Sequence, residues 1–242
     1  WLYNGTLYGN GGAQHLIGGT GDDTFVVYNP TAGTTIVGGG GNDTLQATGD
    51  ISNLNYSGIN TLRVDQNVVI VDETQFNAFN SISTVGDSAI IGVKTAGTYS
   101  LVGKTTSRVD LAADTLDDGV TLIGNDADNE QLIGNSGHST LIAGNGNNVV
   151  FYLGDGITTA IGGSGNTTFR VVNPTIGAGT TIAGGAGINT LDLGPYSINL
   201  ANLSLTNINA LNMGNGAITL TAQEFADLNS IHVTGSGARI LG

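Results

Sequence analysis

Three aspartates in two glycine-rich segments are the residues with the clearest capacity for chemistry. Residues 18–26 read GGTGDDTFV and contain Asp22 and Asp23, and residues 38–46 read GGGGNDTLQ and contain Asp43. A glycoside hydrolase needs two carboxylates held a set distance apart across a cleft. Asp22 and Asp23 are instead sequence neighbours in a turn, an arrangement that favours metal binding.

Composition limits the classes of protein to which the chain can belong. Its 242 residues include 40 glycines and carry a net charge of −13, although only 10% of residues are charged. Hydrophobic residues make up 39%, which excludes an acidic disordered tail. The six Lys and Arg residues are scattered, so nucleic acid is not an expected partner. Few charges with abundant Gly, Asn and Thr are typical of an all-β protein with many tight turns.

Cysteine is absent, which excludes disulfides, thiolate metal sites and a cysteine nucleophile. A secreted protein without disulfides needs another means of stabilisation, and bound calcium is a common one. No apolar run approaches the roughly 18 residues of a membrane-spanning helix, and no signal peptide is visible. Because the chain begins with Trp1 and not with Met, we expect a fragment or a processed form.

The chain contains an internal duplication. GGTGDDTFVVYNPT from Gly18 matches GGSGNTTFRVVNPT from Gly162, an offset of 162 − 18 = 144. QFNAFNSI from Gln75 matches EFADLNSI from Glu224, an offset of 224 − 75 = 149. The offset drifts through small insertions and never jumps. We therefore expect a first solenoid unit at residues 1–92, linking rungs at 93–143 and a second, degenerate unit at 144–242.

A finer repeat lies within this duplication. Clusters of Gly and Asn begin at Gly124, Gly134, Ala143 and Gly162, spaced by nine or ten residues or by twice that. A short alternating strand followed by a glycine turn at this period predicts a β-solenoid. A helix is excluded within these glycine-rich repeats, because each glycine would destabilise it by about 1 kcal/mol. The apolar side chains expected to stack inward, rung on rung, are Phe25, Leu45, Val150, Phe169 and Leu191.

Each unit contains one segment with helical character. Asp72 with Gln75, and Thr221 with Glu224, have the spacing of a helix N-cap and its capping-box partner. We expect one short helix per unit, at residues 72–79 and 221–228. Apolar pairs three residues apart would pack on the edge of the solenoid: Phe76 with Phe79, and Phe225 with Leu228.

The two glycine-rich segments resemble the nonapeptide GGxGxDxUx, where U is a large apolar residue, of the calcium-binding RTX repeat proteins. The later segment LIGNDADNEQLIGNSGHSTLIAGNGNNVV resembles the degenerate, Asn-rich repeats of such proteins. The recurring IN(T/A)L, QF/EF and NSI motifs resemble those of bacterial surface-layer and adhesin-like proteins exported by type I secretion. The resemblance implies a right-handed parallel β-roll or β-helix with calcium between successive turns on one side.

The resemblance also implies a set of metal ligands. Turn carbonyls and the aspartate at the sixth repeat position would surround each calcium, which takes six to eight oxygens. Asp23 and Asp43 hold that position in neighbouring rungs, and a cation between them would offset their repulsion. The residues assigned to the metal site are Asp23, Asp43, Gly19, Gly21, Gly39, Gly41, Asp22 and Asn42.

The second unit departs from the family pattern. Its sixth positions read Asn148, Thr167 and Asn189, so we expect most of its calcium sites to be lost. Hydrogen bonds from stacked asparagines to the backbone would hold those turns instead. Ordinary turn chemistry without metal remains an alternative for all of these residues. Asp126 and Asp128 are a weaker metal candidate, more in keeping with solvated turn acids.

Nothing in the sequence marks a catalytic site or an organic cofactor. His15, His138 and His232 have no nucleophile at a telling spacing. A polysaccharide lyase on this fold would need basic residues along a groove, and the chain has few. We therefore expect a non-enzymatic, secreted module with bound Ca²⁺. Copies of itself and cell-surface polysaccharide are its candidate partners.

The expected role is a calcium-stabilised element of a bacterial surface layer, adhesin or filament. The alternative is a carbohydrate-binding accessory module of a secreted polysaccharide-acting enzyme. That alternative requires aromatic side chains clustered on one face of the solenoid. The candidates are Trp1, Tyr3, Tyr8, Tyr28, Tyr56, Tyr99, Tyr152 and Tyr196.

Overall fold

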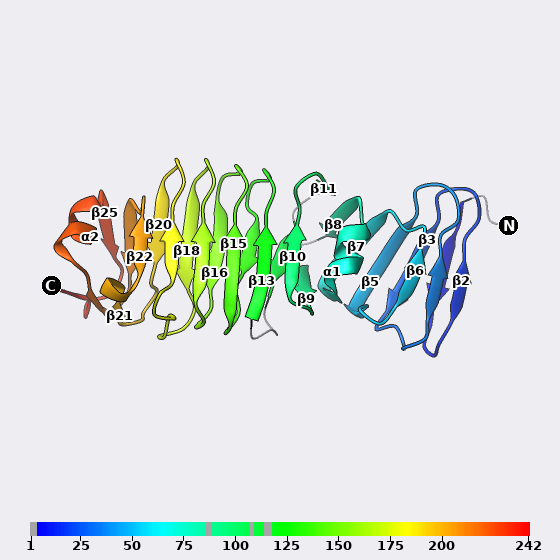
Figure 1. Ribbon diagram of the computed structural model, residues 1–242, viewed down its shortest axis with the longest axis horizontal. Coiled ribbons are helices and arrows are strands. Elements are labelled where there is room, and N and C mark those ends of the chain that lie inside the picture. The colour runs from blue at the N-terminus through cyan, green and yellow to red at the C-terminus, as the bar shows by residue number, and fades with distance from the viewer. Residues whose placement is uncertain (1–3, 86–88, 107–108, 114–117) are drawn as a thin grey trace. The chain divides into compact units, whose positions relative to one another are not determined.

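A computed structural model describes residues 4–85, 89–106, 109–113 and 118–242. The described chain is nearly all parallel β-structure, a β-solenoid of about 11 rungs with two short helices. A rung is one full circuit of the chain, and each strand pairs with its counterpart in the next rung (Figure 1). This confirms the expected fold class. Contacts divide the chain into two compact units, Trp1–Thr95 with Gly103–Leu111 and Ala96–Val102 with Ala112–Gly242. The boundaries drawn from the duplication stay a prediction.

The first unit has two parallel sheets. The strands of its larger sheet are β1 (Thr6–Gly9), β3 (Thr24–Tyr28), β5 (Thr44–Asp50), β7 (Thr61–Val71), β8 (Ser81–Val85), β9 (Ile90–Val93) and β11 (Thr105–Thr106). The smaller sheet has β2 (His15–Ile17), β4 (Thr35–Val37) and β6 (Asn55–Ser57). The long strand β7 pairs with β8 through its first half and with β9 through its second half. Along the chain, the last change from the first unit to the second falls within β12 (Asp110–Ala112).

The second unit has three parallel sheets. One runs β14 (Gln131–Ile133), β16 (Val149–Leu153), β18 (Thr167–Val171), β20 (Asn189–Asp192), β23 (Ala210–Met213) and β25 (Ser230–Val233). Another runs β10 (Gly97–Ser100), β13 (Asp118–Ile123), β15 (His138–Ile142), β17 (Thr158–Ile161), β19 (Thr181–Ala183) and β22 (Ser204–Thr206). The third runs β21 (Ile198–Asn199), β24 (Ala217–Thr219) and β26 (Arg239–Leu241), and a 3-10 turn spans Leu200–Asn202.

Apolar columns form the core of each unit. Phe25 is in register with Leu45, and Phe169 with Leu191, and all four are completely buried. These four residues confirm the expected inward stacking. The expectation for Val150 is wrong, because Phe151 is the residue in register with Phe169 and Val150 is only half-buried.

One extra residue in the turn explains this error. In the turn that begins at Ala143, Val149, which is two residues before Phe151, comes six residues after the start. In the turn that begins at Gly18, Asp23, which is two residues before Phe25, comes five residues after the start. Asn148 is the extra residue, and its backbone adopts the left-handed conformation, with φ of 59°. Asn129 does the same one rung earlier, with φ of 63°. Asparagine tolerates this conformation better than most residues.

The two helices are found where the capping residues predict them. α1 spans Glu73–Ala78 with Asp72 as N-cap, and α2 spans Ala222–Asp227 with Thr221 as N-cap. Both have complete capping boxes. Phe76 and Phe79 are buried, as expected. The matching expectation for the second helix is wrong for Phe225, which is 52% exposed, while Leu228 is half-buried.

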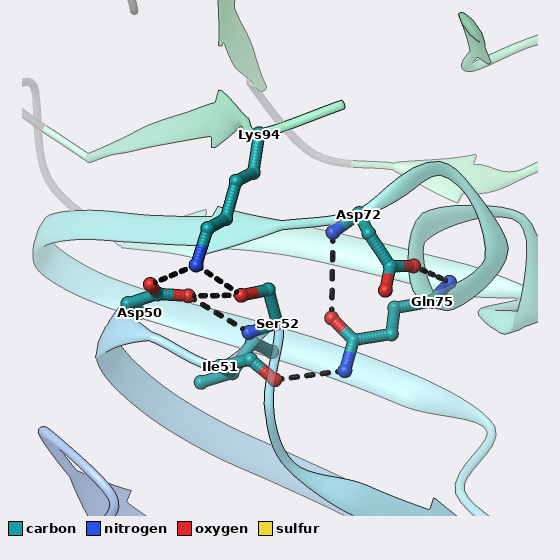
Figure 2. Close-up of polar contacts among 6 residues, drawn as sticks. All are labelled: Asp50, Ile51, Ser52, Asp72, Gln75 and Lys94. Carbon is teal, nitrogen blue, oxygen red and sulfur yellow. Dashed lines mark hydrogen bonds and ion pairs between the residues drawn. The ribbon is translucent and has the colours of Figure 1, made fainter. Parts of the chain in front are cut away.

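Gln75 joins α1 to the body of the first unit (Figure 2). Its Oε1 accepts the Asp72 backbone N–H at 3.4 Å, and its own N–H donates to Asp72 Oδ1 at 2.8 Å. Its Nε2 also donates to the carbonyls of Ile51 at 2.7 Å and Leu54 at 3.1 Å. The equivalent Glu224 caps its helix, but its carboxylate side chain has no N–H to donate to such carbonyls.

We expect Gln75→Ala to lower the free energy of unfolding by about 1–2 kcal/mol, because the buried carbonyls of Ile51 and Leu54 each lose the hydrogen bond from Nε2, and Ile51 keeps only the one from the Leu54 N–H. Urea unfolding followed by circular dichroism measures the change. Glu224→Ala is the matched control, and its effect should stay within about 0.5 kcal/mol because Glu224 is partly exposed. Equal effects of the two substitutions would contradict the role given to the Nε2 hydrogen bonds.

Candidate metal centre

Within each unit, one line of residues connects the glycine turns from rung to rung, and we call it the turn column of that unit. Its members directly precede strand residues that are in register, which fixes their alignment. In the first unit the turn column is Asp23, Asp43 and Asn60; in the second it is Glu130, Val149, Thr167, Asn189 and Asn209. The strand register brings two of the predicted site residues, Asp23 and Asp43, together in neighbouring rungs of this column.

Asp23 and Asp43 are side by side and buried, with exposed fractions of 1% and 0%. The Asp23 backbone N–H donates to Asp43 Oδ1 at 2.8 Å, and the Asp43 N–H donates to Asn60 Oδ1 at 2.9 Å. Asp23 Oδ2 accepts the Gly19 N–H at 2.7 Å. One oxygen of each carboxylate, Asp23 Oδ1 and Asp43 Oδ2, is buried without a hydrogen-bond partner. A buried carboxylate oxygen without a donor is costly unless a cation or a proton is close to it.

The first glycine of each turn leaves room for convergent oxygens. A Cβ atom at Gly38 would lie 2.3 Å from the carbonyl oxygen of Gly58 and 2.4 Å from Asp43 Oδ2. At Gly18 it would lie 2.3 Å from the Gly38 carbonyl and 2.5 Å from Asp23 Oδ2. Each cradle therefore joins a carboxylate oxygen to a carbonyl oxygen of the next rung. Carboxylate and carbonyl oxygens are the ligands that a hard cation such as Ca²⁺ takes. At Gly18 the carboxylate oxygen in the cradle, Asp23 Oδ2, is the one that accepts the Gly19 N–H, whereas at Gly38 it is the unpartnered Asp43 Oδ2.

Burial raises the pKa of Asp43, and the negative charges of Asp23 and Asp22 raise it further. The hydrogen bond from the Asp23 N–H acts in the opposite direction and does not overcome these effects. The folded chain therefore resists a negative charge at Asp43 when no cation offsets it. A divalent ion near this carboxylate would favour the ionised form.

The second unit contains the same cradle, but an asparagine amide replaces the aspartate carboxylate. Asn189 takes the place of Asp43, and a Cβ at Gly184 would lie 2.5 Å from Asn189 Nδ2 and 2.3 Å from the Asn207 carbonyl oxygen. Asn189 Nδ2 donates to the carbonyls of Gly185 and Gly187, both at 3.0 Å. An amide N–H group therefore occupies the position where Asp43 presents an unpartnered oxygen. Hydrogen bonds from an asparagine therefore hold this turn, as expected, and the loss of calcium from it stays a prediction.

The remaining predicted site residues have other surroundings. Asp22 and Asn42 are exposed, and Asp22 Oδ1 accepts the Asn42 backbone N–H at 2.8 Å. Gly19 is buried, and its carbonyl accepts the Gly40 N–H at 3.0 Å. Gly39 and Gly41 adopt φ of 103° and 101°. A Cβ at Gly39 would lie 2.1 Å from the Gly19 carbonyl oxygen, so the two turns stack too closely for any other residue.

Sequence reasoning misplaced one residue of the column and missed another. Asn148 is exposed and lies one residue before the column, which Val149 occupies instead. Glu130 holds the column position one rung earlier and is 1% exposed, with its Oε1 accepting the Asn125 N–H at 3.2 Å. The signal that could have found Glu130 is its place directly before an alternating strand, Gln131–Ile133. The nonapeptide spacing hid it, because its turn is one residue longer.

The other acids of the glycine turns form ladders on the surface. Asp126 and Asp128 are exposed, and their Oδ1 atoms accept the N–H groups of Asn145 at 2.8 Å and Asn147 at 2.7 Å. Asn166 Oδ1 continues the ladder by accepting the Ile188 N–H at 2.8 Å. These side chains supply hydrogen bonds that the turn backbone does not make with itself. Turn chemistry accounts for these acids without a metal ion.

An ion pair on the first unit is also structural. Lys94 Nζ donates to Asp50 Oδ2 at 2.7 Å and to Ser52 Oγ at 2.8 Å (Figure 2). Burial acts to raise the pKa of Asp50, but the hydrogen bonds from Lys94 and Ser52 outweigh it and lower the pKa. His15, His138 and His232 lie in separate strands, β2, β15 and β25.

No group of three or more His, Asp or Glu side chains within 4–85, 89–106, 109–113 and 118–242 is close enough to hold a metal. Any ion at Asp23 and Asp43 would therefore depend on backbone carbonyls for most of its ligands. None of the helices in this part of the chain has the length and apolar character that a membrane crossing requires.

Comparison with models of protein families, with curated proteins and with solved structures finds no match to this chain.

Proposed function

We propose that the chain is an extracellular structural or interaction module whose β-solenoid is stabilised by calcium at the turns of Asp23 and Asp43. The observation that carries this proposal is the pair of buried carboxylates, each with an oxygen that has no hydrogen-bond donor. The resemblance to the RTX nonapeptide supports calcium as the ion. It also supports secretion by a type I system and a role in a surface layer, adhesin or filament. The proposal assigns no catalytic step to the chain.

Calcium would couple folding to location. When calcium is scarce, an ionised Asp43 destabilises the folded state, as its raised pKa indicates. Extracellular modules bind calcium with Kd values of about 10⁻⁴–10⁻³ M. A site with a Kd of about 10⁻⁴ M at about 1 mM calcium contributes about 1.4 kcal/mol to folding. The chain would thus remain loosely folded during export and become rigid outside the cell.

A calcium titration of the chelated chain, followed by circular dichroism and light scattering, tests the proposal. We expect the β-sheet signal or the midpoint of thermal unfolding to rise with calcium and to stay unchanged with the same concentration of magnesium. Mg²⁺ is the matched control because it demands shorter, octahedral coordination. If the chelated chain is fully folded and does not respond to calcium, the segment GGTGDDTFV forms an ordinary glycine-rich turn and not a calcium site.

A second candidate function, binding of a neutral polysaccharide, has one observation in its favour. A hollow of about 300 Å³ lies beside α1, and its polar lining includes Asn55, Asp72 and Thr74. The tyrosines give less support. Tyr99 is completely buried and Tyr56 stacks on Phe79, while Trp1 and Tyr3 lie outside the described residues. Calorimetric titration with neutral oligosaccharides decides between the two functions.

A further inference from the structure

One sheet of the second unit carries a column of hydroxyl groups on its outer face. Its strands β10, β13, β15, β17, β19 and β22 pair in parallel and in this order (Figure 1). The residues that lie opposite one another, without a register shift between them, are Thr98, Thr121, Thr140, Thr159, Thr181 and Ser204. Each of the six is exposed or half-buried. Hydroxyl-bearing side chains therefore follow one another along the surface at every rung of this sheet.

A second column runs beside the first, two residues further along each strand. It consists of Ser100, Ile123, Ile142, Ile161, Ala183 and Thr206. Alternate residues of a strand point to the same face. The residues between the two columns point into the core, and Tyr99, Leu122 and Leu141 are completely buried. Three successive isoleucines thus face outward, and neither column contains a charged residue.

The preference of threonine for strands explains a threonine column but not this two-column face. The first unit also has a threonine column, in which Thr24 is opposite Thr44. The column beside it changes at each rung, from Val26 to Gln46 to Arg63. Uniformity of both columns is therefore not a general property of the outer faces of this solenoid.

Another sheet of the second unit makes the same contrast within the same rungs. On its outer face Tyr152 is opposite Arg170, and Arg170 is opposite Asp192. Arg170 Nε and Asp192 Oδ2 form an ion pair at 3.0 Å. That face carries charge and an aromatic ring, whereas the two-column face carries only hydroxyl and aliphatic groups.

The two columns form a rigid array that repeats in two directions. Neighbouring strands are about 4.8 Å apart, and alternate residues along a strand are about 6.7 Å apart. Threonine and isoleucine are branched at Cβ, which restricts their χ1 rotation. Each threonine hydroxyl can both donate and accept a hydrogen bond. The array therefore presents hydrogen-bonding groups and methyl groups at fixed repeats.

The size and chemistry of this face restrict the ligand that it fits. Six rungs of two columns cover roughly 300 Å², whereas a stable protein–protein contact takes about 800 Å² from each partner. The two columns offer no aromatic ring on which a sugar could stack, since Tyr99 is completely buried. They also offer no charge to an ionic polymer. The matching ligand is a neutral, hydrogen-bonding solid that is periodic in two dimensions.

From this match we infer that the two-column face binds ice, with threonine hydroxyls in the places of water molecules at the crystal surface. The oxygen atoms of hexagonal ice repeat at distances of the same size as those between rungs and between the two columns. The methyl groups make no hydrogen bonds, so the water around them stays bonded to water. The inference adds a ligand to the proposed module. It uses the extracellular location of that module and does not depend on calcium at Asp23 and Asp43.

The growth of single ice crystals in a solution of the chain tests the inference. In saturating calcium we expect the chain to hold the freezing temperature of a small crystal below its melting temperature and to give the crystal flat facets. A folded chain that leaves the two temperatures equal and the crystal round overturns the inference. Circular dichroism reads the response to calcium separately, so that result leaves the proposed function standing.

Thr140→Lys places a long charged side chain in the middle of the face and should abolish the gap between freezing and melting. Thr168→Lys is the matched control, because Thr168 is also a half-buried, outward-facing strand residue but lies in the other sheet, and it should leave the gap unchanged. Circular dichroism checks that both variants are folded, and Thr159→Lys repeats the test one rung further along. An unchanged gap in folded Thr140→Lys contradicts the inference. A dimer in light scattering that Thr140→Lys dissociates, without any effect on ice, would assign the face to a second copy and overturn it.

Discussion

Asp43→Asn is expected to raise the free energy of unfolding of the chelated chain by about 2 kcal/mol at pH 7. The substitution keeps the oxygen that accepts the Asp23 N–H and replaces the unpartnered, buried Oδ2 by an N–H donor. Asn189 shows that this cradle accommodates an amide, whose Nδ2 donates to the Gly185 and Gly187 carbonyls. The same substitution should remove most of the stabilisation that calcium provides. Urea unfolding with chelator and with calcium measures both effects.

The gain from Asp43→Asn should depend on pH. The pKa of Asp43 is raised above its ordinary value of 3.8 in the folded chain. The protonated carboxyl therefore favours folding below about 3.8, and this contribution is lost as the pH rises through the folded pKa. In chelator the variant and the parent chain should be nearly equal near pH 3.5 and diverge toward pH 7.

Asp22→Asn removes the same charge from the exposed neighbour and is the matched control. Its effect should stay within about 0.5 kcal/mol at either pH. If Asp43→Asn destabilises the chelated chain, the buried carboxylate has a partner that the cradle geometry does not supply, and the calcium proposal loses its main support.

The solenoid could be predicted from the sequence because its local and global signals agree. Glycine clusters every nine or ten residues fix the turns, and the apolar residue that follows each turn fixes the inward face. Phe25, Leu45, Phe169 and Leu191 lie at that phase and are buried. Capping boxes are equally local, since N-cap and partner are three residues apart, so both helices were predicted within a residue of their ends.

Features that depend on the length of a single turn escaped prediction. An asparagine in the left-handed conformation adds one residue to the turns before Glu130 and Val149. Since side chains alternate along a strand, a shift of one residue exchanges the inward and outward faces. The shift moved Val150 and Asn148 out of their predicted columns and concealed Glu130. Only the pairing between rungs shows where the column runs.

Burial of the helices could not be read from their own residues. Phe76 and Phe225 share the same sequence context, yet one is buried and the other is half exposed. The difference comes from Lys104 and β11, which lie far along the chain from α1. The environment of a residue at the edge of a solenoid is decided by the next rung, and that rung contributes nothing to the local pattern.

Asn189→Asp is expected to change the free energy of unfolding by more than Asp43→Asn does, and in the opposite direction. It replaces the N–H group that donates to the Gly185 and Gly187 carbonyls by an oxygen, which leaves a buried carboxylate facing two acceptors. The free energy of unfolding in chelator should fall by about 3 kcal/mol. Because the new carboxylate reproduces the chemistry of the Asp43 cradle, millimolar calcium should restore part of this loss.

Asn209→Asp is the control for this substitution. Asn209 contributes only its Oδ1 to the ladder, as acceptor of the Asn189 N–H at 2.8 Å, and a carboxylate oxygen can replace it. We expect a change within about 0.5 kcal/mol and no gain from calcium. If Asn189→Asp destabilises the chain and calcium restores nothing, the cradle geometry alone does not make a metal site. The turns of Asp23 and Asp43 would then need their left-handed glycines, Gly39 and Gly41, to orient carbonyls toward the ion.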